Sequence, residues 1–371
     1  MSDWPTVQLG KALELAYGKS LPKAQREEHG EIPVYGSNGI AGWHSEALVN
    51  EPTVIVGRKG SAGAVQYVDG PCFPIDTTYF VRVREGFSFS AKFLYYLLRR
   101  LNLSRLKTAT GVPGLTRDDA YRETIVAPDD DQQAEVVDLL SRAESIVRLR
   151  KDAQRLVGEL LHSTFARTFG DPATNPMDWP MTTVGGLITA ADYGCSEKAT
   201  SEPFGLPMIR MGNVSYSGAL ALDDLKYVTM SDEDAVRFGL VEGDILFNRT
   251  NSKDLVGKTG LWDGSIDAVV ASYFIRLRVD RSKATPTYLW AFMNSPHMKQ
   301  VLFSTARGAI GQANINSKEL KAFPIPRPPL DLQKTFDERC KALSDLAAQQ
   351  QMALKKAEEA FEALLANCIP L

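Results

Sequence analysis

The sequence contains few of the residues that hold metal ions or disulfide frameworks. It has four cysteines and four histidines among 371 residues. The cysteines lie far apart and include no CxxC pair, so neither a zinc site nor a disulfide framework is indicated. They are Cys72, Cys195, Cys340 and Cys368. We therefore expect no metal site in this chain.

Long apolar runs are also missing. A membrane-spanning helix needs about 20 consecutive apolar residues, and every apolar run in this sequence is shorter. The N-terminal segment lacks the apolar core of a signal peptide. We expect no membrane segment and a cytoplasmic location. The hydrophobic fraction of 44% and the charged fraction of 23% are typical of a folded globular protein.

A strong positive charge, which is typical of small DNA-binding modules, is absent. The formal net charge is -3, whereas such modules usually have a pI above about 9. The segments 128–170 and 328–371 each carry two more acidic than basic residues, so they hold most of the negative excess. A DNA-binding surface in this chain must then be a local basic patch on the remaining segments.

Sequence motifs for catalysis or nucleotide binding are not found either. Gly257-Lys258-Thr259 resembles the end of a phosphate-binding loop, but Ser252 stands where that motif needs its first glycine. The Asn/Asp-Pro-Pro-Tyr/Phe tetrapeptide of amino-methyltransferases does not occur. Fragments of a metal-dependent nuclease pattern, Pro128-Asp129 and Glu319-Leu320-Lys321, fall in different halves of the chain. We expect a chain that is not catalytic by itself and that binds no cofactor.

What the sequence does contain is an internal repeat. Each half opens with Trp-Pro, at Trp4 and at Trp179, and then shows two β-type runs, an aromatic helix pattern, a glycine-containing loop and a strand leading to proline. The paired segments are 53–63 and 244–253, 77–83 and 271–279, 91–98 and 287–293, 109–114 and 306–311, and 124–128 and 322–326. The repeat predicts two α/β (α+β) globular domains, residues 1–127 and 171–327.

A long helical pattern closes each half, over residues 128–170 and 328–371. Asp129 to Asp131 supply an N-cap and an acidic first turn, Asp331 has the same role in the second helix, and Gly170 ends the first. Both helices carry a heptad pattern in one register, offset by 200 residues, with a polar residue at the same interior position, Arg150 or Gln350. The apolar seam residues are Val136, Leu139, Ile146, Val157, Leu160, Phe336, Leu343 and Leu346.

A helix of roughly 38 residues is about 57 Å long, which is too long to be buried within one domain. Together with the shared register, this length predicts that the two helices pair as an antiparallel coiled coil. The alternative is that each helix caps its own domain as an ordinary core helix.

Polar, glycine-containing loops in both halves are the candidates for DNA contacts. Glycine lets a backbone approach its ligand closely, and Arg, Lys, Asn, Gln and Ser side chains bind phosphates and base edges. Each loop taken alone could equally be a solvated turn, and it is the paired occurrence that favours binding. The candidate residues are Tyr35, Ser37, Asn38, Arg58, Lys59, Ser61, Arg210, Asn213, Arg249, Thr250, Asn251, Lys253, Arg307, Gln312 and Asn314.

Several motifs, in this order and in duplicate, make the sequence similar to the specificity subunits of type I restriction-modification systems over essentially its full length. They are Trp4-x-x-Val7-x-Leu9-Gly10, Ile32-Pro-Val-Tyr-Gly-Ser-Asn-Gly39, Val56-Gly-Arg-Lys-Gly-Ser-Ala-Gly63, Ala306-Arg-Gly-Ala-Ile-Gly-Gln-Ala-Asn-Ile-Asn316 and Pro328-Pro-Leu-Asp-Leu-Gln333. The first half departs from the family pattern in segment 111–116, which lacks Gln and Asn, and in segment 128–133, which lacks the Pro-Pro-Leu opening.

The resemblance implies that residues 1–127 and 171–327 are target-recognition domains, each reading one half of a split site in double-stranded DNA. The helices 128–170 and 328–371 would be the central and C-terminal conserved regions. Two methyltransferase subunits would dock on them, and restriction (translocase) subunits would join the complex. Chemistry would belong to these partners, with S-adenosylmethionine for the methyltransferase and ATP and Mg for the endonuclease.

The helices would also act as a spacer, so that the two DNA words are separated by about 10 base pairs centre to centre. Three other functions stay open at this point. They are a stand-alone sequence-specific DNA-binding regulator, a self-sufficient enzyme such as a nuclease or NTPase, and a recognition subunit of a related defence system.

Overall fold

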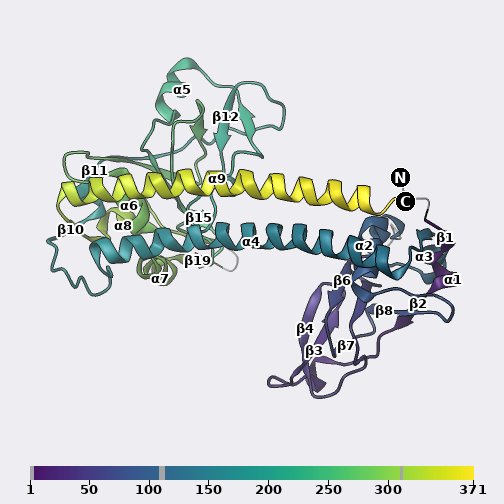
Figure 1. Ribbon diagram of the computed structural model, residues 1–371. Coiled ribbons are helices and arrows are strands. Elements are labelled where there is room, and N and C mark those ends of the chain that lie inside the picture. The colour runs from purple at the N-terminus through teal and green to yellow at the C-terminus, as the bar shows by residue number, and fades with distance from the viewer. Residues whose placement is uncertain (1–3, 108–112, 310–311) are drawn as a thin grey trace. The chain divides into compact units, whose positions relative to one another are not determined.

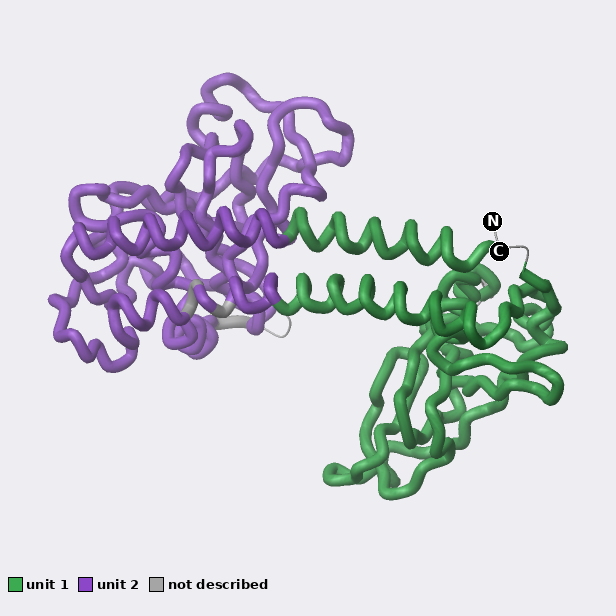
Figure 2. Tube along the Cα trace, in the orientation of Figure 1, with its two compact units in different colours: residues 1–152, 351–371 green, residues 153–350 purple. Residues whose placement is uncertain are grey.

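A computed structural model describes residues 4–107, 113–309 and 312–371 of the chain. The chain forms two compact units, residues 1–152 with 351–371 (unit 1) and residues 153–350 (unit 2), coloured separately in Figure 2. The units divide within the two long helices, because part of each helix packs in each unit. The predicted domain boundaries, which treat the helices as separate segments, remain a prediction.

Unit 1 combines strands and helices around a sheet of order β2-β8-β5-β6, with a second sheet of order β4-β3-β7. The run Thr53–Gly57 forms the interior strand β5 and is buried throughout, which explains why it is continuously apolar rather than alternating. The elements are β1 (Thr6–Gln8), α1 (Leu9–Ala12), β2 (Leu13–Tyr17), β3 (Ile32–Gly36), β4 (Gly39–His44), β5 (Thr53–Gly57), β6 (Val65–Val68), β7 (Phe73–Pro74), β8 (Thr78–Val83), α2 (Ala91–Leu101), α3 (Arg117–Tyr121) and β9 (Thr124–Val126), most of which are labelled in Figure 1.

Unit 2 repeats this topology. Its main sheet has the order β11-β18-β14-β16 and its second sheet the order β13-β12-β17. The elements are β10 (Met181–Thr183), β11 (Ile188–Tyr193), β12 (Leu206–Ile209), β13 (Lys226–Val228), α5 (Asp232–Phe238), β14 (Ile245–Asn248), β15 (Thr250–Asn251), β16 (Thr259–Leu261), β17 (Val269–Val270), β18 (Phe274–Val279), α6 (Pro286–Met293), α7 (Pro296–Thr305), β19 (Arg307–Ala309), β20 (Gln312–Asn314), α8 (Ser317–Ala322) and β21 (Pro324–Pro326).

The correspondence between the sheets confirms the repeat that the sequence predicts. In both units the first strand pairs antiparallel with the last, β1 with β9 and β10 with β21. Both units also contain a parallel pair in the second sheet, β3 with β7 and β12 with β17. The mixed α and β character of both domains is therefore confirmed.

Each long helix begins and ends close to the predicted residues. Helix α4 (Asp130–Phe169) is preceded by Asp129, whose side chain accepts from the Gln132 N–H at 2.8 Å, and Gly170 follows its last turn with φ +82°. Helix α9 (Leu330–Cys368) begins one residue before Asp331. Asp331 is therefore an acidic residue of the first turn and not the predicted N-cap, because the helix already begins at Leu330, directly after the two prolines.

The two long helices pack against each other in both units. In unit 1, Val136 and Leu140 of α4 share a core with Phe361 and Leu365 of α9. In unit 2, the rings of Phe169 and Phe336 lie 5.0 Å apart between centroids. Because the start of α4 meets the end of α9 in unit 1, and the reverse holds in unit 2, the pairing is antiparallel, as predicted. Residues of both helices also belong to the two domain cores. The alternative that each helix is a core helix of a domain is therefore partly correct.

As a buried seam between the two helices, the predicted set is wrong at half of its positions, and its role in partner binding stays a prediction. Val136, Val157 and Phe336 are buried, and Leu343 is half-buried. The exposed residues are Leu139, Ile146, Leu160 and Leu346. The buried residues on α4 include Gln133, Val136 and Leu140, and those on α9 include Gln333, Phe336 and Cys340. The buried positions of α4 and α9 are still related by an offset of 200 residues, as predicted. Every second buried position lies one residue after the predicted one, as at Leu140 instead of Leu139.

Candidate nucleic-acid interface

In each unit, the loop after the central strand meets the segment before a short helix. In unit 1, the Leu115 N–H donates to the Arg58 carbonyl at 2.9 Å and the Gly60 N–H donates to the Pro113 carbonyl at 3.0 Å. In unit 2, the Ile315 N–H donates to the Arg249 carbonyl at 3.0 Å, and β15 pairs with β20. The structure thus joins loops that are separate in sequence. We call residues 57–61 with 113–117, and residues 248–253 with 314–317, the loop platforms.

A glycine follows the first strand of the main sheet in each unit and lies against a backbone carbonyl. A Cβ on Gly18 would lie 2.2 Å from the carbonyl oxygen of Ile75, and one on Gly194 would lie 2.3 Å from that of Ala271. Such distances are far inside van der Waals contact, so only glycine fits at these two positions. The residues before them, Tyr17 and Tyr193, are held beside the platforms as a result.

An arginine stacks on an exposed tyrosine in both units. The Arg58 guanidinium lies 5.3 Å from the Tyr17 ring centroid, and the Arg249 guanidinium lies 4.8 Å from the Tyr193 ring centroid. The tyrosines are 47% and 44% exposed. Cation–π contact of this kind holds a cation on a surface while leaving its outer edge accessible. Arg117 adds a second guanidinium 4.5 Å from the Tyr17 ring in unit 1 alone.

Sequence reasoning missed Tyr17, Arg117 and Tyr193. The available signal was the Tyr-Gly pair that recurs at the end of the first sheet strand in both halves. These residues stand at strand ends and at a helix start, outside the polar glycine-containing loops that the repeat marks as candidates.

The predicted contacts around the two arginines are mostly at the surface. Lys59 and Ser61 are exposed, and Asn314 is exposed on β20 beside Thr250. Asn251 donates from Nδ2 to Asn248 Oδ1 at 2.8 Å, so it is partly committed to the fold. Lys253 is exposed and lies 4.6 Å from the Phe303 ring centroid. The structure therefore brings Thr250, Asn251 and Asn314 together, as one platform.

Two predicted DNA contacts are wrong. Asn213 is 2% exposed and its amide bonds the carbonyls of Ala221 and Asp224, each at 2.9 Å. Ser37 is 7% exposed and donates from Oγ to the Thr77 carbonyl at 2.7 Å. Both side chains are structural because burial and satisfied hydrogen bonds leave them no access to a ligand.

The other predicted residues lie outside the platforms. Tyr35 is half-buried against a small core, and Asn38 is exposed in the turn between β3 and β4. Arg210 donates from Nη2 to the Asp224 carbonyl at 3.1 Å. The side chains of Arg307 and Gln312 lie outside the described residues, as does segment 108–112. For these positions DNA contact remains a prediction.

Two lysines of unit 2 lie near Asn248 of the platform, whose backbone is hydrogen-bonded to Gly257 and Lys258. Lys299 donates from Nζ to the Gly257 carbonyl at 3.0 Å, and the Lys258 ammonium bonds the Met211 carbonyl. Burial, with a smaller effect from the neighbouring Lys258 charge, lowers the pKa of Lys299 to about 8.

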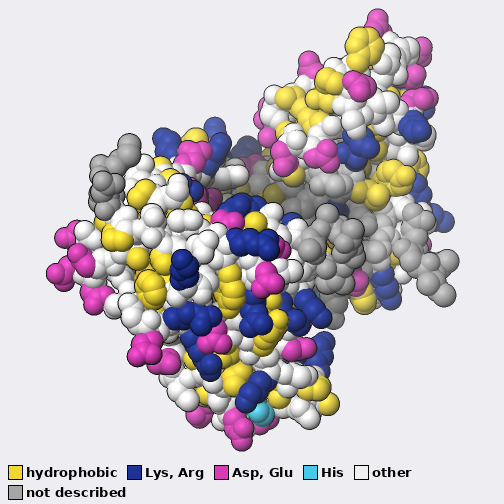
Figure 3. Space-filling model, turned by 90° about the vertical axis from the view of Figure 1, so that its right-hand side faces the viewer, with side chains coloured by type: hydrophobic (Ala, Val, Ile, Leu, Met, Phe, Trp, Pro, Cys, Tyr) yellow, Lys and Arg dark blue, Asp and Glu magenta, His cyan; other side chains and the backbone are white. Residues whose placement is uncertain are grey.

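On unit 1, Lys and Arg side chains are frequent on the face that Figure 3 presents, interspersed with Asp and Glu. This mixture agrees with the nearly neutral composition of the domain, which limits any DNA-binding surface to local patches.

A buried glutamine connects each domain to its long helix. Gln133 Oε1 accepts from the Ser90 N–H and Gln333 Oε1 accepts from the Thr285 N–H, both at 2.9 Å. Ser90 and Thr285 are the N-cap residues of α2 and α6. The glutamine Nε2 atoms donate to the carbonyls of Pro128 and Pro328. Each helix thus holds the domain helix next to it in a defined position.

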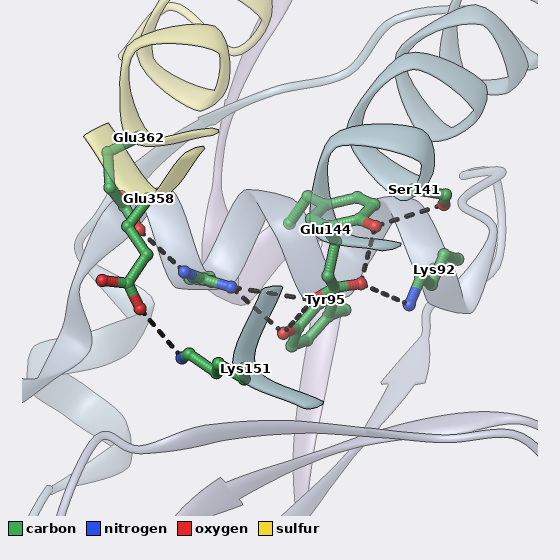
Figure 4. Close-up of polar contacts among 9 residues, drawn as sticks. Lys92, Tyr95, Ser141, Glu144, Lys151, Glu358 and Glu362 are labelled. Carbon is green, nitrogen blue, oxygen red and sulfur yellow. Dashed lines mark hydrogen bonds and ion pairs between the residues drawn. The ribbon is translucent and has the colours of Figure 1, made fainter. Parts of the chain in front are cut away.

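In unit 1 a charged network reinforces this junction (Figure 4). Glu144 of α4 accepts from Tyr95 at 2.8 Å and Tyr96 at 3.0 Å, and pairs with Lys92 at 3.1 Å. Burial alone would raise the pKa of Glu144, but these donors outweigh it and lower the pKa below its usual value. Lys151 of α4 pairs with Glu358 of α9 at 2.9 Å.

The described part of the chain contains no cluster of three or more His, Cys, Asp or Glu side chains able to hold a metal ion. Within the same residues, no helix is both long and apolar enough to cross a membrane.

Two copies of one domain fold each present a loop platform in which an arginine stacks on an exposed tyrosine. The family model for the type I restriction modification DNA specificity domain matches residues 1–156 and 176–357. The chain therefore belongs to this family, as its sequence motifs led us to expect.

Curated relatives agree with this assignment. The MjaX type I restriction enzyme specificity subunit of Methanocaldococcus jannaschii is 30% identical over 172 residues, which cover 46% of this chain and 40% of the relative. The EcoKI specificity subunit of Escherichia coli is 26% identical over 188 residues, covering 49% and 40%. The chain thus matches only 40% of the length of each of these two relatives.

Solved structures show the same fold. The type I restriction-modification S subunit of M. genitalium superposes with a TM-score of 0.63 at 14% identity, covering 100% of this chain and 96% of that one. A chain from a structure of type I R-M complex assembly superposes with a TM-score of 0.59 at 19% identity, covering 99% and 98%.

Proposed function

We propose that this chain is the DNA-recognition subunit of a type I restriction-modification enzyme, and that each unit reads one of two DNA words. The observation that carries the proposal is the duplicated loop platform. The backbone hydrogen bonds and the Arg–Tyr stack are the same in both units, while the side chains around them differ. Two surfaces with the same backbone framework but different polar side chains are suited to bind two different short DNA sequences within one split site.

The chain supplies recognition and its partners supply the chemistry. Methyl transfer would belong to two methyltransferase subunits using S-adenosylmethionine, and cleavage to restriction subunits using ATP and Mg. The proposal is supported by the family assignment and by sequence, since no motif for these reactions occurs in the chain.

The methyltransferase subunits would dock on an apolar stripe of α4. Its residues recur at heptad spacing along the helix, and they are between 43% and 62% exposed. They are Leu139, Ile146 and Leu149 in unit 1, and Leu156 and Leu160 in unit 2. Exposed leucines at this spacing suit an added helix of a partner protein.

Selection from a random duplex library tests the proposal. The full chain is used alone and together with its methyltransferase, and the retained duplexes are sequenced. We expect the complex to enrich two short words at a constant separation. Equal enrichment by the chain alone would favour a stand-alone regulator, and no enrichment by either would contradict sequence recognition.

A further inference from the structure

Arg58 and Arg249 share their backbone hydrogen bonds and their stacking partner in the two repeats. Their N–H groups donate to the carbonyls of Thr77 at 2.8 Å and Tyr273 at 2.9 Å. Their carbonyls accept from Leu115 and Ile315, which precede the N-caps of α3 and α8. Both guanidinium groups stack on a strand-end tyrosine. These arginines are therefore positioned by the fold and not by the particular loop sequence.

The residues beside these arginines differ between the units. Lys59 corresponds to Thr250, which follows Arg249 in the same way. Arg117 corresponds to Ser317, since each is the first residue of its short helix. Arg117 stacks on Tyr17, whereas the Ser317 N–H donates to the Tyr193 hydroxyl at 3.3 Å. The platforms thus combine one constant cation with variable neighbours.

This division matches the two kinds of contact that DNA offers. Phosphates are the same at every sequence, whereas base edges differ from word to word. A guanidinium binds a phosphate through two parallel N–H donors. The Arg58 Nε donates to the Asp76 carbonyl at 3.0 Å, and among the described residues its terminal nitrogens have no hydrogen-bond partner. The terminal nitrogens of Arg58 are thus able to donate to a phosphate.

We propose that Arg58 and Arg249, held on Tyr17 and Tyr193, bind phosphodiester groups of the DNA backbone in any sequence. The side chains that differ around them, Lys59 and Arg117 in unit 1 and Thr250 and Asn314 in unit 2, select the bases. The inference rests on the proposed function and assigns separate tasks within each platform.

The experiment measures binding of the full chain with its methyltransferase to two labelled duplexes. One duplex carries the words selected as above, and the other carries a scrambled sequence. The variants are Arg58→Gln and Arg249→Gln. Matched controls are Arg82→Gln and Arg237→Gln, because these arginines also lie on aromatic rings, at 4.9 Å and 5.1 Å, but outside the platforms. Thermal unfolding checks that every variant folds.

Each platform variant should weaken binding to both duplexes by the same factor, about tenfold for one charge-assisted contact. It should also reduce the slope of log affinity against log salt by about 0.9, the value for one phosphate. Lys59→Thr and Arg117→Ser should weaken binding to the selected duplex alone. The control variants should leave affinity and slope unchanged.

Loss of affinity for the selected duplex alone, with an unchanged salt slope, would mean that the arginine reads a base and would overturn the inference. Full affinity in both platform variants would overturn it as well. If Arg58→Gln does not fold, Arg58→Lys replaces it, and we expect a smaller loss of affinity with the slope retained. An unmodified complex that does not distinguish the duplexes would contradict the proposed function, while the slopes would still decide the phosphate assignment.

Discussion

Gln133 and Gln333 each link a long helix to the domain helix beside it. Both are buried, and each bonds the N-cap backbone of a domain helix and the carbonyl of a proline. An amide is suited to this place because it can accept and donate at once. A carboxylate could not donate to the proline carbonyl, and an aliphatic side chain would satisfy neither group.

We expect Gln333→Ala to lower the free energy of unfolding of unit 2 by about 1–3 kcal/mol, because it leaves the buried Thr285 N–H without a partner. Chemical denaturation measures the change. Gln349→Ala is the matched control, since Gln349 is exposed on the same helix. Equal stability of Gln333→Ala and the control would show that the buried hydrogen bonds contribute nothing.

At the scale of elements, the junction of α2 and α4 depends on the charge of Glu144. Its pKa lies below the usual value in the folded protein, so the stabilising contribution is present above about pH 4.5 and is lost as the pH falls through the folded pKa. We expect Glu144→Gln to destabilise unit 1 by about 1–3 kcal/mol at neutral pH.

The difference between Glu144→Gln and the unmodified chain should then shrink below pH 4.5. Unfolding curves at several pH values measure it, with Glu135→Gln, at an exposed position of the same helix, as the control. A difference that does not change with pH would contradict the role assigned to the charge.

The apolar stripe on α4 gives a second prediction at this scale. Leu149 is 62% exposed, so Leu149→Glu should change stability by less than about 0.5 kcal/mol. If the stripe binds the methyltransferase, the variant should no longer co-purify with it. Val236→Glu, at a position on α5 that is 81% exposed, is the control. Normal co-purification of Leu149→Glu would place the docking surface elsewhere.

The long helices also show where sequence-based prediction stops. Asp129 and Gly170 have local roles, and both were predicted correctly. The buried seam was not predicted correctly, because α4 carries two apolar stripes at heptad spacing. One stripe includes Val136 and Leu140 and is buried, whereas the other includes Leu139 and Ile146 and is exposed. A heptad pattern cannot tell which stripe faces the partner helix, since both satisfy it equally.

For the whole molecule, the repeat could be predicted because it orders whole elements along the chain. The residue-by-residue alignment of the two repeats could not be predicted. The sequence paired segments 109–114 and 306–311, whereas the hydrogen bonds to Arg58 and Arg249 make Leu115 equivalent to Ile315. The loops differ in length before these residues, so glycine positions mislead the alignment. Tyr17 and Tyr193 are far from Arg58 and Arg249 in sequence, so the recurring Tyr-Gly pair marks them as equivalent but does not place them beside the arginines.

The spacer hypothesis makes a prediction for the molecule as a whole. Each long helix has segments in both units. Inserting seven residues into both, after Arg150 and after Gln350, would lengthen each by about 10 Å. We expect the separation of the two DNA words to grow by about three base pairs. An insertion in one helix alone should mismatch the pairing and abolish activity. An unchanged separation in the double insertion would refute the spacer hypothesis.

The most direct test of the central claim is single-molecule methylome sequencing of a host that carries this gene with its methyltransferase gene. A strain that lacks only this gene serves as the comparison. We expect a methylated motif of two short words around a fixed gap, which disappears when the gene is deleted. Unchanged methylation in the deletion strain, with an active methyltransferase, would contradict the account.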